Sequence, residues 1–162
     1  MFPGGDDEER AGPIVPAGVH LAPLWRRVVG LAIDQLLVAA PVLAAFAAAG
    51  HPPGEALDGD TMVWSSMAMT GVAMVYETIG VWRWGRTIGK WAMGTKVVHV
   101  ADGGSVVASS ALLRALVPAA FGVVPEVGPI LSIAVYLLAF FDPRRQGLHD
   151  KAAGTLVGQV RG

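Results

Sequence analysis

The sequence predicts an all-α membrane protein, a helical bundle of about four membrane-embedded helices with a small cytoplasmic β-hairpin. Hydrophobic residues make up 53% of the 162 residues and charged residues only 15%, whereas soluble domains carry about 25% charged residues. The mean hydropathy is +0.52. The apolar residues also gather in long runs, and a run of about 20 residues crosses a bilayer as a helix. Three full spans are also compatible with this pattern.

Two apolar stretches predict membrane-spanning helices, over residues 24–49 and 62–82. From Val28 onward the first stretch has Asp34 as its one ionisable residue, and the second has Glu77 as its only charge before its basic end. Both stretches are longer than the hydrocarbon core requires. They are therefore the two spans on which the predicted topology depends.

Basic residues predict the orientation of these two spans. The Arg26–Arg27 pair precedes the first span, and the connecting residues 50–60 contain no Lys or Arg. Cytoplasmic loops of membrane proteins carry an excess of Lys and Arg. We therefore expect both the N-terminus and the segment after the second span to lie in the cytoplasm. The basic residues of that segment are Arg83, Arg86, Lys90 and Lys96.

The third apolar segment predicts two shorter helices, over residues 107–124 and 129–142. Basic residues flank this segment on both sides, which two crossings satisfy and one crossing does not. The apolar part of the second helix, residues 130–141, is only about 18 Å long. An embedded helical hairpin is the preferred interpretation, with a cytoplasmic C-terminus. A short span, a re-entrant pair, or a surface helix with one span stay open.

The remaining segments are predicted to lie outside the bilayer. Residues 95–108 contain two β-branched runs around Asp102-Gly103-Gly104, which predicts a short hairpin because glycine supplies positive φ at the turn. Residues 155–160 are a third candidate strand. Residues 1–20 are rich in Pro, Gly and acidic residues and are expected to be a disordered tail. Residues 21–162 then form the membrane domain.

Asp34 is the most informative single residue of the sequence. It lies about 15 Å of helical rise from residue 24, near the middle of a bilayer. An ionised carboxylate there costs at least a few kcal/mol unless it is paired or solvated. Two roles stay open. Asp34 is either a proton or cation site, or a tether that bonds to hydroxyl groups or to an arginine of its own bundle.

Four further ionisable residues are candidates for the same ion, proton or structural network: Arg27, Glu77, Arg114 and Asp150. Arg27 points to the same side of its helix as Asp34, because seven residues turn a helix by about 700°. Glu77 should lie at the depth of Arg27 in an antiparallel pair, and an ion pair between them would join the two helices. Arg114 either reaches the lipid headgroups or pairs with Asp34, Glu77 or Asp150.

Signals of enzyme chemistry are missing from the sequence. Gly89-Lys90 does not complete a phosphate-binding loop, because Trp84 stands where glycine is needed and Trp91 where Ser or Thr is needed. The four histidines have no metal-ligand spacing, and there is no cysteine. We therefore expect no enzyme activity, no cofactor and no metal. The net charge of −1 gives no indication of a nucleic-acid partner.

Together these residues resemble the RDD family of bacterial integral membrane proteins, named for one arginine and two aspartates. The resemblance covers about residues 22–160. Arg27 in LWRRVVGLAID is similar to the family's arginine and Asp34 to its first aspartate, and Asp150 in RRQGLHDKAAGTLV is similar to the second. The segment GRTIGKWAMGTKVVHVADGG is similar to the family's cytoplasmic stretch after the second span, and Arg114 to a basic position common there.

The resemblance implies a multi-pass protein of the bacterial plasma (inner) membrane. Transport is the activity usually suggested for the family, and cation/proton antiport is attributed to some members. Two functions stay open. The first is a small transporter or exchange component for a monovalent cation or proton, acting as a homo-oligomer because about four helices are few for a transporter. The second is an accessory or assembly subunit of a larger membrane complex, with no transport activity of its own.

Overall fold

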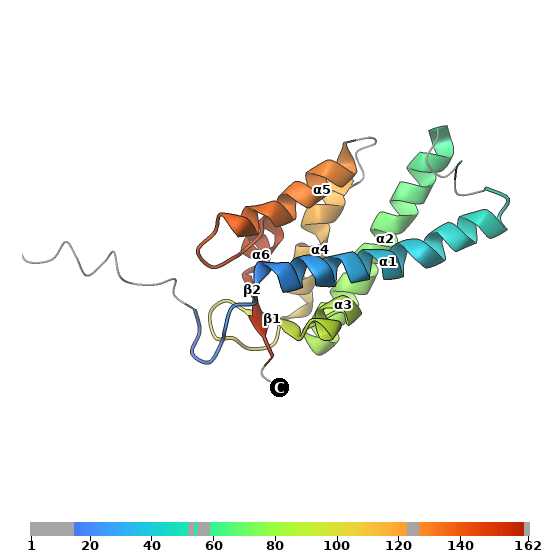
Figure 1. Cartoon of the computed structure of the whole chain (residues 1–162). Coiled ribbons are helices and arrows are strands. Elements are labelled where there is room, and N and C mark those ends of the chain that lie inside the picture. Colours follow the sequence, from blue (N-terminus) through green and yellow to red (C-terminus); the bar gives the residue numbers. More distant parts are fainter. Residues whose placement is uncertain (1–14, 52–53, 55–58, 123–126, 161–162) are drawn as a thin grey trace, which may run out of the picture.

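A computed structural model describes residues 15–51, 54, 59–122 and 127–160. It shows a bundle of long helices with a small sheet and two short helices gathered at one end, which we call the cap (Figure 1). The predicted helical bundle with a small β-element is confirmed at this level. The elements in chain order are α1 (Leu24–Ala48), α2 (Gly59–Trp84), α3 (Ile88–Ala92), β1 (Thr95–His99), α4 (Ala108–Gly122), α5 (Gly128–Leu137), the 3-10 helix η2 (Leu138–Phe140), α6 (Leu148–Ala153) and β2 (Thr155–Gln159).

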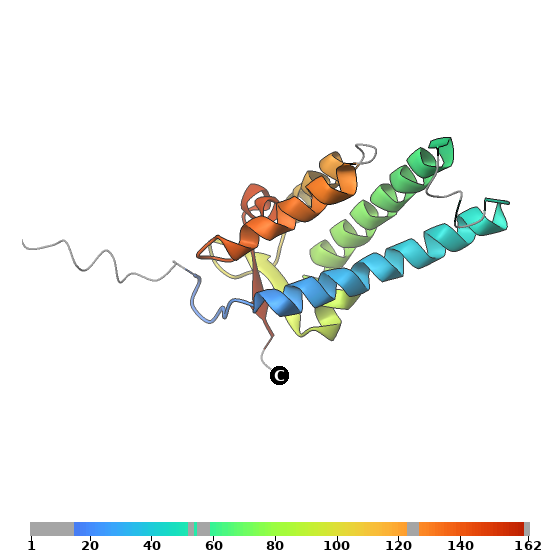
Figure 2. The ribbon, with the colours of Figure 1, turned by 45° about the horizontal axis from the view of Figure 1, so that its top comes forward.

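The helices α1 and α2 are the two longest elements; α2 packs against both α1 and α4, and α4 packs against α5 (Figure 2). Among the described residues, α1 is the helix that length and composition alone would allow to cross a membrane. Two shorter apolar helices, Ala108–Gly122 and Ile130–Phe140, are also present. Helix α1 continues through Pro41, as membrane helices often do.

The helices α4 and α5 form the predicted helical hairpin. The Ser132 hydroxyl on α5 donates a hydrogen bond to the Pro118 carbonyl on α4, at 3.0 Å. Near the turn the backbones approach so closely that a Cβ on Gly128 would lie 2.7 Å from the Gly122 carbonyl oxygen. Residues 123–126 of the predicted turn lie outside the described part. At 15 residues, α4 is about 22 Å long.

The sheet is antiparallel but it is not the predicted hairpin. Strand β1 pairs with β2, with Val97 opposite Val157, so the third candidate strand is confirmed and the second β-branched run is not a strand. The glycine turn itself is present, because Gly103 has a φ of +70°. After this turn the chain buries Val106 against Val97 and Val157. It then enters α4 before a strand ladder can form.

The described residues before α1 belong to the cap. Leu21 forms an isolated antiparallel bridge with Gly158, and the Gln159 N–H donates to the His20 carbonyl at 2.7 Å. The predicted tail is therefore wrong for residues 15–20, which the C-terminal strand holds in place. Residues 1–14 lie outside the described part. One consequence is that both described ends of the chain lie at the cap.

Large apolar side chains cover the outside of the helices. Leu36 on α1 is 70% exposed, Ile130 on α5 is 68% exposed and Phe141 is 87% exposed. Soluble monomers rarely expose contiguous apolar patches larger than a few hundred Å². An apolar exterior over polar interior groups is the arrangement that lipid surroundings favour. The exposed tryptophans at the cap end of the helices are Trp25, Trp82, Trp84 and Trp91.

Candidate functional site

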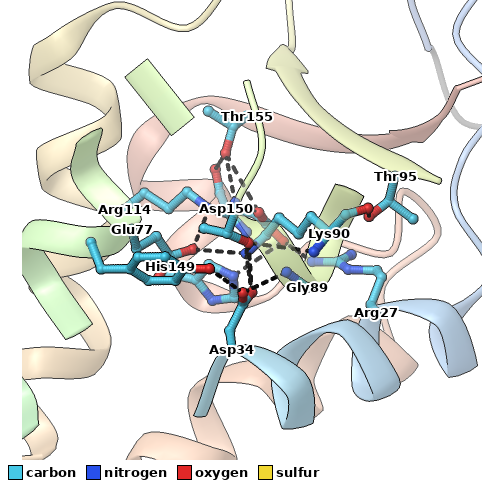
Figure 3. A network of polar contacts seen from close by, with 12 residues as sticks. Arg27, Asp34, Glu77, Gly89, Lys90, Thr95, Arg114, His149, Asp150 and Thr155 are labelled. Carbon is cyan, nitrogen blue, oxygen red and sulfur yellow. Dashed lines mark hydrogen bonds and ion pairs between the residues drawn. The ribbon is translucent and has the colours of Figure 1, made fainter. Parts of the chain in front are cut away.

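A network of three carboxylates and three basic side chains lies where the cap meets the bundle (Figure 3). Its formal charges cancel. The structure brings together all five residues that the sequence singled out and adds Lys90 from α3. The six residues are Asp34, Glu77 and Asp150 with Arg27, Lys90 and Arg114.

Asp34 is fully occupied by partners from α2 and α3. Its Oδ1 accepts hydrogen bonds from the Tyr76 hydroxyl and the Gly89 N–H, both at 2.7 Å. Its Oδ2 accepts one from the Thr87 hydroxyl at 2.5 Å and lies 3.7 Å from Lys90 Nζ. A carboxylate offers about four lone-pair sites, so these partners saturate it. This geometry supports the tether role that the sequence left open.

Two glycines allow α3 to reach Asp34. A Cβ on Gly89 would lie 2.1 Å from the Gly30 carbonyl oxygen and 2.8 Å from Asp34 Oδ1. Helices α1 and α3 therefore touch backbone to backbone at this point. The approach matters because it brings an N–H donor and the Thr87 hydroxyl to a carboxylate on another helix. Asp34 is thus covered by the segment that follows α2, as a tether between α1 and α3 requires.

Asp150 is the centre of the second half of the network. The guanidinium groups of Arg27 and Arg114 both donate to its carboxylate, and the Gly147 N–H donates to Oδ2 at 3.0 Å. Arg114 also donates to Thr155 Oγ1 at 3.1 Å. Asp150 and Arg114 are buried, where an unpaired charge is strongly destabilising. The pairing therefore holds α1, α4 and α6 together.

Glu77 connects the two halves of the network. Its Oε1 accepts hydrogen bonds from Arg114 Nε at 3.2 Å and Lys90 Nζ at 3.3 Å. Its Oε2 accepts none from the residues that the structure describes. The predicted direct pair of Glu77 with Arg27 is wrong. Helices α3 and α4 place their own cations nearer to Glu77, while α6 places Asp150 within reach of Arg27.

A cavity of about 290 Å³ opens beside this network, among α1, α2, α4 and α5. Of the six charged residues, Asp34, Glu77 and Lys90 line it, whereas Arg27, Arg114 and Asp150 do not. Two tyrosines share the polar end, and the walls are mostly apolar. Tyr76 and Tyr136 lie at the polar end, and the walls include Leu31, Val38, Met69, Met74 and Ile133. Uncharged polar side chains also line the cavity, among them Gln35, Ser66, Thr70 and Ser132.

His149 packs beside the network, next to Asp150. It is fully buried on α6, and its ring centroid lies 4.3 Å from that of Tyr136. Burial, followed by the positive charges of Arg114 and Arg27, lowers the pKa of His149 well below 6.5. The imidazole is therefore neutral at physiological pH and acts as a packing group beside Asp150.

An apolar helical bundle closed at one end by an ion-paired cap is the arrangement that suits an integral membrane protein with a polar network in its interior. The chain belongs to the RDD family, whose model matches residues 21–154. The resemblance seen in the sequence is thus confirmed, and RDD proteins are membrane proteins. No curated protein and no solved structure gives a significant match to the chain.

Lys90 is the site residue that sequence reasoning missed. It was counted among the basic residues of a cytoplasmic segment, yet it lies between Asp34 and Glu77 (Figure 3). The available signal was the spacing Thr87-x-Gly89-Lys90. Within four positions the sequence offers a helix-capping hydroxyl in Thr87, a residue without a side chain in Gly89 and a cation in Lys90. This combination is typical of a segment that packs closely against an acidic side chain.

Proposed function

We propose that this chain is a multi-pass protein of the bacterial plasma membrane. Support comes from two exposed tryptophans on α2, Trp64 and Trp82. They are 18 residues apart, which corresponds to about 27 Å along a helix, close to the roughly 30 Å of a hydrocarbon core. Tryptophan is enriched at both membrane interfaces. Helix α2 would then cross the membrane antiparallel to α1.

We also propose that the cap lies in the cytoplasm. Three of its elements, α3, β1 and α6, carry a lysine, whereas the sequence that connects α1 to α2 and α4 to α5 contains no Lys or Arg. This asymmetry fits the positive-inside rule. Because Leu21 pairs with Gly158, both described ends would face the same compartment.

A pair of single-cysteine variants tests this orientation, since the chain has no cysteine of its own. Gly54→Cys places a thiol at an exposed position between α1 and α2, and Arg86→Cys places one in the cap. We expect a membrane-impermeant maleimide applied from the periplasmic side to label position 54 and not position 86. Permeabilised cells provide the control, in which position 86 should also react. Labelling of position 86 in intact cells would overturn the proposed topology.

We infer further that the protein exchanges a cation for protons at Glu77, as part of a homo-oligomer. The observation that carries this proposal is Lys90, which lies 3.3 Å from Glu77 and 3.7 Å from Asp34 at the edge of the cavity. A cation that reaches the open Oε2 of Glu77 competes with Lys90, which keeps Asp34 as its partner. Protonation of Glu77 weakens the hold on that cation and releases it.

Flux through proteoliposomes tests the exchange. With a pH-sensitive dye inside the vesicles, an imposed cation gradient should drive proton movement, and Glu77→Gln should reduce it more than about tenfold because the exchangeable charge is lost. Asp102→Asn is the control, since the Asp102 side chain is 73% exposed and does not line the cavity. A folded Glu77→Gln protein with unchanged flux would exclude Glu77 as the exchange site.

An accessory or assembly role is the second candidate function. The observation that favours it is that Arg27, Arg114 and Asp150 do not line the cavity and instead hold the cap to the bundle. Ion pairs that only stabilise the fold are what we expect in a subunit that has no transport activity of its own. A pull-down in mild detergent that returns a membrane partner in fixed stoichiometry, from a protein inactive in vesicles, would support this role over exchange.

A further inference from the structure

We propose that the cavity binds a small organic ammonium compound with an apolar body. This inference rests on the proposed exchange function and names the class of its cation. It concerns the space bounded by Glu77, Lys90 and the walls of four helices. The size of the cavity fits a small organic molecule. A volume of about 290 Å³ is at the lower end of the roughly 300–1,000 Å³ of small-molecule pockets, and is far more than a bare metal ion fills.

The charged groups of the cavity are unevenly distributed over its lining. Charged and phenolic groups occupy one end of the cavity, whereas Leu31 and Val38 from α1, Met74 from α2 and Ile133 from α5 supply apolar wall. A hydrated metal ion gains nothing from such walls. An amphiphilic molecule does, because burial of its apolar part is worth about 25 cal/mol per Å². The cavity therefore suits a ligand with one charged end and a mainly apolar body.

The charge at the polar end of the cavity favours a cationic ligand. Arg114 balances the charge of the network as a whole, but the oxygen that has no cationic partner among the described residues belongs to the Glu77 carboxylate, which lines the cavity and favours a positive head over a negative one. Both contacts to Glu77 engage Oε1, which leaves Oε2 as the acceptor for the ligand. The rings of Tyr76 and Tyr136 line the same end, and aromatic faces attract ammonium groups.

The same geometry couples binding to proton release. When a protonated Glu77 loses its proton as an ammonium ligand arrives, the total charge of the buried site is unchanged. The O–H bond of the carboxylic acid breaks, its electron pair stays on Glu77, and the proton leaves to solvent. An ammonium ligand that bound beside a protonated Glu77 without this proton release would add a second uncompensated positive charge to the network, and burying net charge is costly. The one-for-one replacement is therefore the favourable route for that state. Asp34 takes no part, because its four partners already saturate it.

Calorimetry on the purified full-length protein in nanodiscs tests the inference with three matched probes. Phenethylamine is a cation at neutral pH, phenethyl alcohol is its neutral counterpart, and hydrocinnamate carries the negative charge. We expect saturable binding of phenethylamine, and binding of the other two weaker by more than about tenfold. Glu77→Gln should weaken phenethylamine binding by a similar factor. Equal binding of amine and alcohol would overturn the inference.

Cavity-filling variants provide a test that leaves every charge in place. Ala119 and Ala73 line the cavity, whereas the neighbouring Ala120 and Val72 are exposed. Ala119→Phe and Ala73→Leu should each weaken phenethylamine binding more than about tenfold by occupying its space. Ala120→Phe and Val72→Leu should leave it unchanged. If both filled variants unfold at the wild-type temperature and still bind the amine normally, the cavity is not its site.

The outcomes separate this inference from the exchange function. Phenethylamine binding that depends on Glu77 and Ala119, without any cation-driven proton flux, would support the cavity as an ammonium site and end the exchange proposal. Suppose instead that sodium or potassium chloride drives a Glu77-dependent flux in a protein that does not bind phenethylamine. That result would support the exchange proposal and would exclude an organic ammonium compound as its cation.

Discussion

Replacing Asp150 with asparagine is expected to reduce the free energy of unfolding by about 3–5 kcal/mol, the usual cost of breaking a buried ion pair from one side. The variant keeps the shape of the side chain but removes its charge. Arg27 and Arg114 both point their guanidinium groups at this carboxylate. Arg114 is 1% exposed, so water cannot replace the lost partner. The two like charges would then face each other across a neutral amide.

Unfolding in detergent followed by tryptophan fluorescence measures this effect, because the chain has five tryptophans. Asp102→Asn serves as the matched control. It makes the same chemical change at a side chain that is 73% exposed, where ion pairs contribute at most about 1 kcal/mol. Similar unfolding midpoints for the two variants would show that the Asp150 carboxylate does not hold the cap to the bundle.

Gly89→Ala is expected to have the second-largest effect, a loss of about 3 kcal/mol, at the upper end of the cost of overpacking. The new methyl group would meet the backbone oxygen of Gly30 at 2.1 Å and the Asp34 carboxylate at 2.8 Å. Backbone atoms cannot rotate away, so α3 must move off α1. The Gly89 N–H and the Thr87 hydroxyl would then leave Asp34, and a buried carboxylate would lose most of its partners.

Gly71→Ala is the control for this second variant. It makes the same substitution inside α2, where no atom lies within 4 Å of the added methyl group. Alanine is favoured over glycine inside a helix by about 1 kcal/mol, so this variant should be at least as stable as the parent. If Gly89→Ala behaved like Gly71→Ala, the close approach of α1 and α3 would be incorrect.

The sequence predicted the helices well because their signal is local. Apolar runs of the required length reveal α1 and α2 without any knowledge of their neighbours. The proline-rich turn separates α4 from α5 in the same way. The network residues were also predictable as a set, because an ionisable side chain in an apolar run needs a partner somewhere. Arg27, Asp34 and Asp150 could be found on this basis and on the family resemblance.

The pairings within the network could not be predicted, because they depend on contacts between distant segments. Which cation meets Glu77 is decided by how α3 folds back after α2 and by how deep α4 places Arg114. The β-pairing was missed for a related reason. A glycine turn after β1 predicts a local hairpin, but β2 provides the better partner some 60 residues later and no local pattern shows this.

The pairing of β1 with β2 also constrains how the polypeptide matures. Val97 leaves the ribosome long before its partner Val157, so β1 stays unpaired while the helices between the two strands are made. The Arg27–Asp150 contact spans the chain in the same way. Closure of the cap is therefore a late event in biogenesis. Messages truncated before codon 155 should yield inserted but protease-sensitive products, which the quality-control proteases of the cell can recognise.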